Sequence, residues 1–314
     1  MYFPTAGIEC NPLAPFGAAL CISFFTSMGG ISGAFLLLPF HMSVFGYVNP
    51  SVSATNQFFN ILACPPGVWR YWREGRLIWP LALTVAAGTL PGVFLGALIR
   101  VNWLPDPDKF KIFAGLVLLY VGVRMARSAW KSRPTAQRNP APQGTGTATT
   151  PEKDSICAGP DAPAGCCRVL EWNTRRLAFA FQEKKHVIST PGLALLSLVV
   201  GLVGGVYGIG GGAIMAPFLV SFFALPVYAV AGATLFATFL TSVAGVSFYS
   251  LLAPLYPGTA IAPDWRMGLL VGLGGMCGMY FGARCQKHVP ATTLKCLLAA
   301  ILLFTALRYL GQAF

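Results

Sequence analysis

The 314-residue chain is too apolar and too poor in charge for an ordinary soluble domain: 55% of its residues are hydrophobic and 10% are charged, against about 25% charged residues in soluble domains. Its net charge of +12 would suggest nucleic-acid binding in a soluble protein. In an apolar chain, such a charge is typical of lysine and arginine kept in loops on the cytoplasmic side of a membrane. The composition therefore predicts an all-α polytopic protein of the cell membrane and argues against a nucleic-acid partner.

Eight apolar segments follow one another along the chain, each compatible with the roughly 20 helical residues that cross a bilayer core. The N-terminal MYFPTAGIECNPLAPF has no basic residue before the first segment and carries three prolines, so no cleavable signal peptide is expected. The segments cover residues 14–46, 51–69, 77–99, 110–130, 191–224, 227–254, 265–285 and 291–312.

A polar connector, residues 131–190, separates the fourth and fifth segments. Its first part, KSRPTAQRNPAPQGTGTATTPEKDSICAGPDAPAGCC, is rich in Pro, Gly, Thr and Ala and is predicted to be a flexible linker. The following RLAFAFQEKKHVIS alternates apolar and polar residues on either side of a polar turn, which predicts a small β-hairpin outside the membrane. The basic residues in and beside the connector favour a cytoplasmic position.

The sequence repeats itself in order. GISGAFLLLPF (30–40) matches GIGGGAIMAPF (208–218), and GVFLGA (92–97) matches GMYFGA (278–283). Between and after these pairs, SAT (53–55) matches GAT (232–234), and LLYVGVR (118–124) matches LLFTALR (302–308). We therefore expect two homologous four-segment repeats, residues 1–130 and 191–314, as in many secondary transporters that hold their substrate between two halves.

The first and fifth segments are too long for one crossing, because the 34 residues of 191–224 would reach about 50 Å as one helix. Both contain glycine clusters, SMGGISG and GGVYGIGGG, at which a helix break is predicted. Irregular backbone at membrane depth must be buried or face a cavity, and a broken helix offers free N–H groups and a positive dipole end to an anion. The candidate anion-binding residues are Gly29, Gly30 and Gly33 at the first break, and Tyr207, Gly208, Gly210, Gly211 and Gly212 at the second.

Close helix packing is the alternative explanation for glycine in membrane helices. It is the favoured interpretation for the four-residue spacings of Gly92 with Gly96 and of Gly278 with Gly282.

Polar residues inside apolar segments must find partners or line a pathway. Asn56 and Asn60 lie on one face of the second segment and could donate to an oxyanion without adding charge. Thr234 and Thr238, with Thr241 and Ser242, lie on one face of the sixth segment, although threonine hydroxyls often bond to their own helix backbone. Ser27 and Tyr207, beside the two breaks, are candidates for gating or ligand contact.

Charged residues lie at segment ends, where anchoring at the membrane interface explains Asp264, Arg266 and most of the others. No buried carboxylate for a proton relay is expected. His41 is a candidate for such a relay, although a loop histidine is the favoured interpretation. Coupling to protons, to sodium or to no ion stays open.

The nine cysteines do not predict a metal or redox site. Cys157, Cys166 and Cys167 lack the paired CxxC spacing of a zinc site, although a redox-sensing or sulfur-handling role for these connector thiols stays open. The sequence has no GxxxxGK loop, no HExxH and no GxSxG. An enzyme, a bound cofactor and a metal are therefore not expected, and transport without ATP would be secondary or channel-like.

Three stretches resemble the sulfite exporter TauE/SafE family of membrane permeases: GGVYGIGGGAIMAPF, its weaker copy GGISGAFLLLPF, and DWRMGLLVGLGGMCGMYFGA. The resemblance covers nearly the whole chain outside the connector. It implies export of sulfite or organosulfonates, and more broadly of small sulfur-containing or carboxylate anions. Ser32 and Ala34 stand where the second copy has Gly210 and Gly212, so an asymmetric site is expected.

The sequence thus predicts an alternating-access permease embedded in the lipid bilayer, with a small anion as its substrate. An anion channel and a membrane sulfur-handling protein are the alternatives, and assembly as a homo-oligomer is left open.

Overall fold

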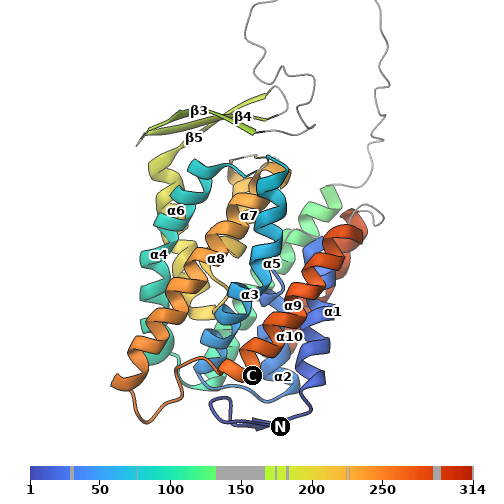
Figure 1. Cartoon of the computed structure of the whole chain (residues 1–314), viewed down its shortest axis with the longest axis vertical. Helices are drawn as coiled ribbons and strands as arrows, with labels where there is room; N and C mark the ends of the chain where they lie inside the picture. Colours follow the sequence, from blue (N-terminus) through green and yellow to red (C-terminus); the bar gives the residue numbers. More distant parts are fainter. Residues whose placement is uncertain are drawn as a thin grey trace, which may run out of the picture.

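The computed structural model describes residues 1–28, 32–75, 77–131, 167–173, 175–181, 184–223, 225, 227–285 and 291–312. Within these ranges the chain forms ten α-helices, one short 3-10 helix and two small antiparallel sheets (Figure 1). In this described part of the chain, three helical stretches are long and apolar enough to cross a membrane on length and composition alone, namely Trp79–Asn102, Thr190–Tyr207 and Val230–Leu255. The predicted helical membrane architecture is therefore confirmed in its class, whereas the count of eight spans stays a prediction.

Five helices precede the connector and five follow it. The first five are α1 (Leu13–Met28), α2 (Ala34–Val44), α3 (Ser51–Arg73), α4 (Trp79–Asn102) and α5 (Pro107–Lys131). The second five are α6 (Thr190–Tyr207), α7 (Gly211–Phe222), α8 (Val227–Leu252), α9 (Trp265–Cys285) and α10 (Ala291–Gly311), with the 3-10 helix η1 (Ala253–Leu255) after α8. The long first and fifth segments are each divided into two helices near their glycines, as predicted.

Two small sheets lie at opposite ends of the helical bundle. At the end away from both chain termini, β3 (Cys167–Trp172), β4 (Arg176–Phe181) and β5 (Lys184–Ser189) form an antiparallel sheet in that order (Figure 1). The predicted hairpin is β4 with β5, and β3 is a third strand in the connector that the sequence analysis did not predict. At the other end, β1 (Tyr2–Phe3) pairs with β2 (Ile8–Glu9). Cys157 and Cys166 lie outside the described residues.

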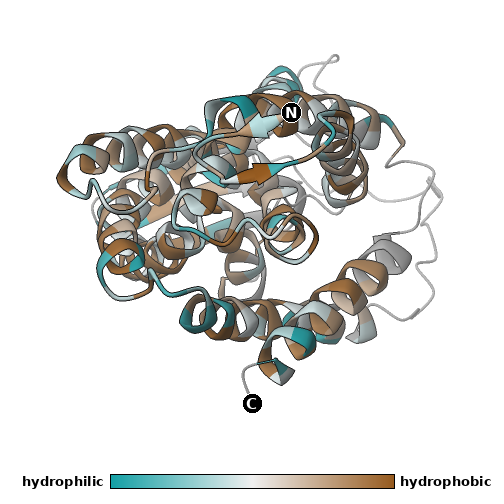
Figure 2. Ribbon diagram, turned by 90° about the horizontal axis from the view of Figure 1, so that it is seen from below, coloured by the Kyte–Doolittle hydropathy of each residue, from teal (hydrophilic) through white to brown (hydrophobic). Residues whose placement is uncertain are grey.

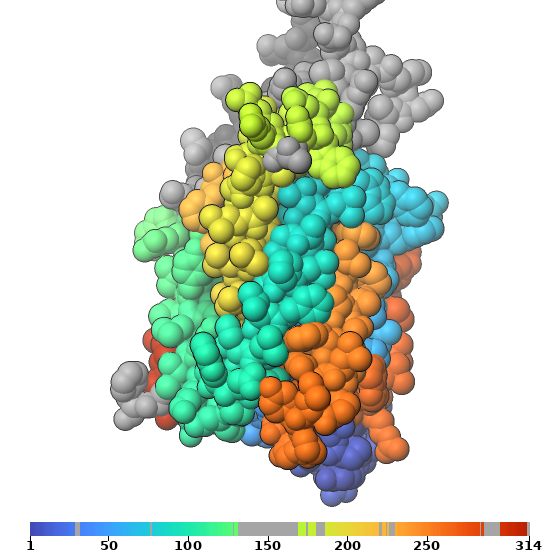
Figure 3. Space-filling view, turned by 90° about the vertical axis from the view of Figure 1, so that its left-hand side faces the viewer, coloured from blue at the N-terminus to red at the C-terminus, as the bar shows by residue number. Residues whose placement is uncertain are grey.

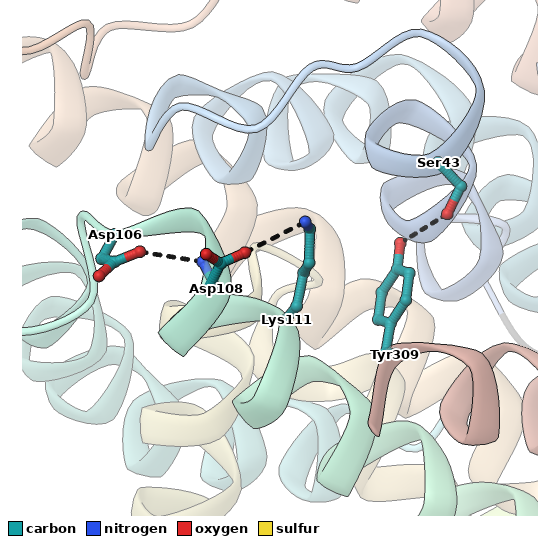
Figure 4. Close-up of polar contacts among 5 residues, drawn as sticks. All are labelled: Ser43, Asp106, Asp108, Lys111 and Tyr309. Atoms are coloured by element: carbon teal, nitrogen blue, oxygen red, sulfur yellow. Dashed lines mark hydrogen bonds and ion pairs between the residues drawn. The ribbon is translucent and has the colours of Figure 1, made fainter. Parts of the chain in front are cut away.

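Local capping groups define several helix starts. Asp106 Oδ1 accepts the Asp108 N–H at 3.0 Å just before α5 (Figure 4), and Asp264 Oδ1 accepts the Met267 N–H at 3.0 Å at the start of α9. Short acidic side chains are favoured at these positions because they pair with N–H groups that have no partner inside the helix. The far end of α10 is tied to α2, because Tyr309 Oη lies 3.0 Å from Ser43 Oγ (Figure 4).

Glycine stripes bring helices of the two halves into close contact. A Cβ on Gly92 or Gly96 of α4 would collide with the backbone of α6, at Leu198 O and Leu202 O respectively, and these two helices lie side by side on the surface (Figure 3). Gly278 and Gly282 of α9 approach the backbone of α1 in the same manner. The packing interpretation of these four glycines is therefore confirmed, and each interface joins one half of the chain to the other.

The helix directions follow from which residues meet. Gly115 and Gly122 of α5 face Leu310 and Leu303 of α10, so these helices are antiparallel. By the same criterion α1, α3 and α9 run one way, and α4, α6 and α8 run the other way. Each helix of the second half thus runs opposite to its counterpart in the first half: α6 opposite to α1, α8 to α3, α9 to α4, and α10 to α5.

The helices expose mainly apolar surface around the bundle. Hydrophobic residues predominate along the helices seen end-on (Figure 2), and the exposed large side chains of α6 are Leu195 and Val199. In water such a surface would be costly, whereas in lipid it is matched by the acyl chains. The fold therefore requires a bilayer around it.

We expect Gly92→Ala to lower the free energy of unfolding of the purified protein by about 1–3 kcal/mol, the usual cost of overpacking. The added methyl group meets backbone atoms of α6, which cannot rotate away as a side chain could. Gly17→Ala, in α1, is the matched control, since a Cβ there meets nothing within 4 Å. Equal melting temperatures for the two variants in detergent would contradict the proposed packing of α4 on α6.

Candidate functional site

The break between α6 and α7 is built from glycine backbone conformations. Gly208, which ends α6, has φ 80°, and Gly210, which precedes α7, has φ 79° and ψ 146°. Residues with a Cβ rarely adopt such angles. The N–H groups of Gly208 and Ile209 both bond to Gly204 O, at 2.8 and 3.0 Å, so α6 closes in a tight turn before the chain resumes as α7.

The carbonyl groups of this break are paired with side chains of α3. Ser53 Oγ donates to Val206 O at 3.1 Å, Asn56 Nδ2 donates to Gly208 O at 3.1 Å, and Asn60 Nδ2 donates to Ile209 O at 2.7 Å. The three donors are spaced three and four residues apart, so they share one face of α3. These bonds replace the water that an interrupted helix would otherwise need.

The same asparagines attach the first break to the second. Asn56 Nδ2 also donates to Ala34 O, at the start of α2, at 3.0 Å. Asn60 Oδ1 accepts a hydrogen bond of 2.6 Å from Ser32 Oγ. Tyr207 adds a third link, because its hydroxyl donates to Phe35 O at 3.2 Å. The structure thus brings together Asn56, Asn60 and Tyr207 from the predicted set, whereas Gly29 and Gly30 lie outside the described residues.

The N–H side of the break faces the hydroxyl groups of α8. Thr241 Oγ1 accepts the Gly211 N–H at 3.3 Å. The hydroxyls of Thr234, Thr238 and Thr241 donate to carbonyls of their own helix four residues earlier, at 3.1, 2.8 and 2.7 Å. The interpretation that these threonine hydroxyls bond to their own helix backbone is therefore confirmed, since each donates its hydrogen within α8.

Four polar atoms around the break are buried without a hydrogen-bond partner in the part of the chain that the structure describes. They are Asn56 Oδ1, Gln57 Oε1, Gln57 Nε2 and Ser242 Oγ. Ser242 Oγ lies 2.8 Å from the position that a Cβ on Gly210 would take. Gln57 lies against Gly245, one turn further along α8. Neither Gln57 nor Ser242 was among the residues predicted to bind substrate. Ser242 lies on the polar face already noted in the sixth segment, and the spacing of Gln57, three residues before Asn60, could have placed it near the polar face of the second segment.

The remaining glycines of the predicted site have packing contacts of their own. A Cβ on Gly208 would collide with the backbone of Ser53, and one on Gly212 would collide with Thr234 O. A Cβ on Gly211 would collide with Thr89, and one on Gly33 would lie 2.7 Å from Ser23 Oγ. Close approach to α1, α3, α4 and α8 thus accounts for these glycines, and their part in ligand binding stays a prediction.

Arg100 is a buried cation beside the second break that the sequence analysis did not single out. Its guanidinium donates to Ser53 Oγ and Val48 O, each at 3.4 Å, and to Leu104 O, and its Cζ lies 3.7 Å from the centre of the Phe110 ring. Among the described residues it has no carboxylate partner. Because Ser53 in turn bonds to the last turn of α6, the positive charge lies where it complements the negative end of that helix dipole.

Two charged or titratable side chains are more buried than expected. His41 lies inside α2 with 0% exposure, and neither ring nitrogen has a partner among the described residues. The expectation of a loop histidine is wrong, because α2 continues past Pro39 into the core. Asp264 is 1% exposed and accepts hydrogen bonds from Thr5, Ala6 and Met267 N–H groups. It is a buried cap rather than an interface anchor.

Metal ligands are not grouped in the described chain: no cluster of three or more His, Cys, Asp or Glu side chains there could hold an ion. The polar groups at the break are instead amides, hydroxyls and N–H groups. Such groups can form hydrogen bonds with a polar or anionic solute.

Among the described residues, ten helices with apolar exposed side chains, which include the interrupted pairs α1–α2 and α6–α7, define a polytopic integral membrane protein. The family model described as Sulfite exporter TauE/SafE matches residues 15–309, and the chain belongs to this family of membrane permeases for sulfite and related anions. Neither curated proteins nor solved structures gave a significant match to the chain.

We expect Asn56→Leu to destabilise the protein, because the nearly isosteric side chain removes the donor to Gly208 O, which lies outside the helices, and the link to Ala34 O at the start of α2. Each buried acceptor left unpaired costs about 1–3 kcal/mol. Thermal unfolding of the purified variant measures the effect, with Asn102→Leu, at the exposed end of α4, as the control. If both variants melt like the unsubstituted protein, α3 does not hold the two breaks together.

Proposed function

We propose that this protein is a secondary transporter that exports a small oxyanion, with sulfite or an organosulfonate as substrate, through a site at the second helix break. The observation that carries the proposal is the set of polar atoms on α3 and α8 at the break that are buried without a partner among the described residues, of which Ser242 Oγ lies beside Gly210. Such atoms each cost about 1–3 kcal/mol when they stay unpaired, so a ligand that pairs with them is bound favourably. Membership of a family of sulfite and anion exporters supports the substrate class.

The chemistry around Gly210 matches an oxyanion. The start of α7 presents N–H groups and the positive end of its dipole, which favour negative charge. Ser242 Oγ and Gln57 Nε2 are donors without partners among the described residues, and sulfite or sulfonate oxygens are acceptors. Arg100 adds a positive charge near the break without occupying it, because its donors are directed to Ser53, Val48 and Leu104.

The two halves support a mechanism of alternating access. We propose that residues 1–130 and 191–314 are repeats of inverted orientation joined by the connector 131–190, because matched helices run in opposite directions. Inverted repeats allow one half to rock against the other around a site between them. The α3–α8 contact, which carries the unpaired atoms, lies at such a junction. The basic connector favours the cytoplasmic side of the cell membrane for the three-stranded sheet.

Sulfite efflux from proteoliposomes containing the purified full-length protein tests the proposal, with and without a pH gradient. We expect saturable efflux, and we expect Ser242→Ala to raise the KM for sulfite by about tenfold or more, since a hydrogen bond to a charged group contributes about 1.5–3 kcal/mol. Gly210→Ala should reduce efflux further, because it combines an unfavourable φ with a contact to Ser242 Oγ.

Gly258→Ala is the control for these variants, since a Cβ there meets nothing within 4 Å. An unchanged KM in a folded Ser242→Ala protein would place the site elsewhere. Flux that does not saturate with sulfite concentration and does not depend on an ion gradient would indicate a channel. Loss of activity only in a Cys166→Ser, Cys167→Ser double variant would favour the sulfur-handling alternative, and no flux of sulfite or any sulfonate would overturn the substrate assignment.

A further inference from the structure

A cleft of about 870 Å³ lies between the C-terminal ends of α3 and α9, away from the proposed transport site. Its polar and aromatic walls are formed by Trp69, Arg70, Arg73, Glu74, Tyr280 and Arg284. This is the end of the bundle that carries the three-stranded sheet, because α3 leads directly into α4, and α4 runs parallel to α6, which begins at β5.

The cleft lies beyond the region in which glycines of α9 pack closely against α3. Gly268 and Gly272 of α9 hold α3 close, at Phe58 and Leu62. Beyond them, Pro65 and Pro66 interrupt the hydrogen-bond ladder of α3, and proline inside a helix disturbs its course. Pro66 and the buried Met279 also line the cleft, so its lining combines apolar side chains with a charged rim.

Arginine dominates the charge of the rim. Three arginines face one glutamate there, and that glutamate is held by Arg70, whose Nε lies 2.8 Å from Glu74 Oε1. Arg284 lies over the Tyr280 ring, with its Cζ 4.5 Å from the ring centre. Within the described chain, neither Arg73 nor Arg284 has an ion pair. Arginine is the side chain best suited to bind phosphate through two parallel N–H donors.

Aromatic side chains place this rim at the level of the lipid headgroups. Trp69 and Trp72 are 55% and 51% exposed, and Tyr280 is 46% exposed. Exposed tryptophan and tyrosine gather at the membrane–water interface. A ligand here can therefore meet arginine at its polar end and apolar wall at its other end, which a soluble anion does not need.

We propose that this cleft binds an anionic phospholipid, with the headgroup phosphate between Arg73 and Arg284 and the glycerol and upper acyl carbons against Pro66 and Met279. Basic pockets between membrane helices recognise anionic headgroups in this manner. The site is independent of the transported substrate, because it lies beyond the α3 residues that contact the helix breaks.

Native mass spectrometry of the detergent-purified full-length protein, titrated with phosphatidylglycerol or phosphatidylcholine, tests this proposal. We expect one tight phosphatidylglycerol-binding event that phosphatidylcholine does not reproduce. The Arg73→Gln, Arg284→Gln double variant should lose about tenfold or more in affinity for that lipid. Arg266→Gln, an exposed arginine at the opposite end of α9, should bind phosphatidylglycerol as the unsubstituted protein does.

Equal phosphatidylglycerol binding in the double variant, or equal binding of the two lipids, would overturn the site. Displacement of phosphatidylglycerol by millimolar inorganic phosphate or sulfite, with binding of the free anion, would replace the lipid by a soluble ligand and overturn the proposal. If the double variant does not fold, Arg73→Lys and Arg284→Lys keep the charge but lose the paired donors, and each is expected to weaken binding. Because these measurements involve no flux, their failure is separate from failure of the transport assay.

Discussion

The pairing of backbone groups at an interrupted helix is the constraint on which this structure depends. A turn that leaves α6 and starts α7 inside an apolar bundle exposes carbonyl and N–H groups that lipid cannot satisfy. The chain satisfies the carbonyls with Ser53, Asn56 and Asn60 of α3, and it directs the N–H groups toward α8. The polar residues of α3 therefore have a structural role, and the proposed ligand site uses the atoms that this pairing leaves without a partner among the described residues.

Close helix contacts make this pairing geometrically feasible. An asparagine side chain spans only a few ångströms, so α3 and the break must lie nearly in contact. The collision of a Cβ on Gly208 with the Ser53 backbone shows that they do. The glycine stripes of α4 on α6 and of α9 on α1 fix the neighbouring helices in the same way. Glycine thus acts twice: it permits the left-handed turn, and it lets the helices that complete the turn come close.

Charge is distributed according to its distance from water. Near the break, Arg100 is fully buried and its donors meet carbonyls, a hydroxyl and an aromatic face. At the sheet end of the bundle, arginines gather on an exposed aromatic rim instead. A buried guanidinium is costly unless its donors are occupied, whereas arginines at an interface stay available to partners. The same residue type therefore stabilises backbone in one place and forms a binding surface in the other.

Sequence alone determined the membrane class, the breaks in the first and fifth segments, the β4–β5 hairpin and the family, because these depend on composition, local periodicity and glycine spacing. It also indicated that Asn56 and Asn60 share a helix face. Only the tertiary structure decided what that face contacts, because Ala34 and Gly208 are joined by Asn56 across 22 and 152 positions of chain. The burial of Arg100, His41 and Asp264 and the opposite directions of the two halves were likewise decided by packing between distant segments, which no local pattern encodes.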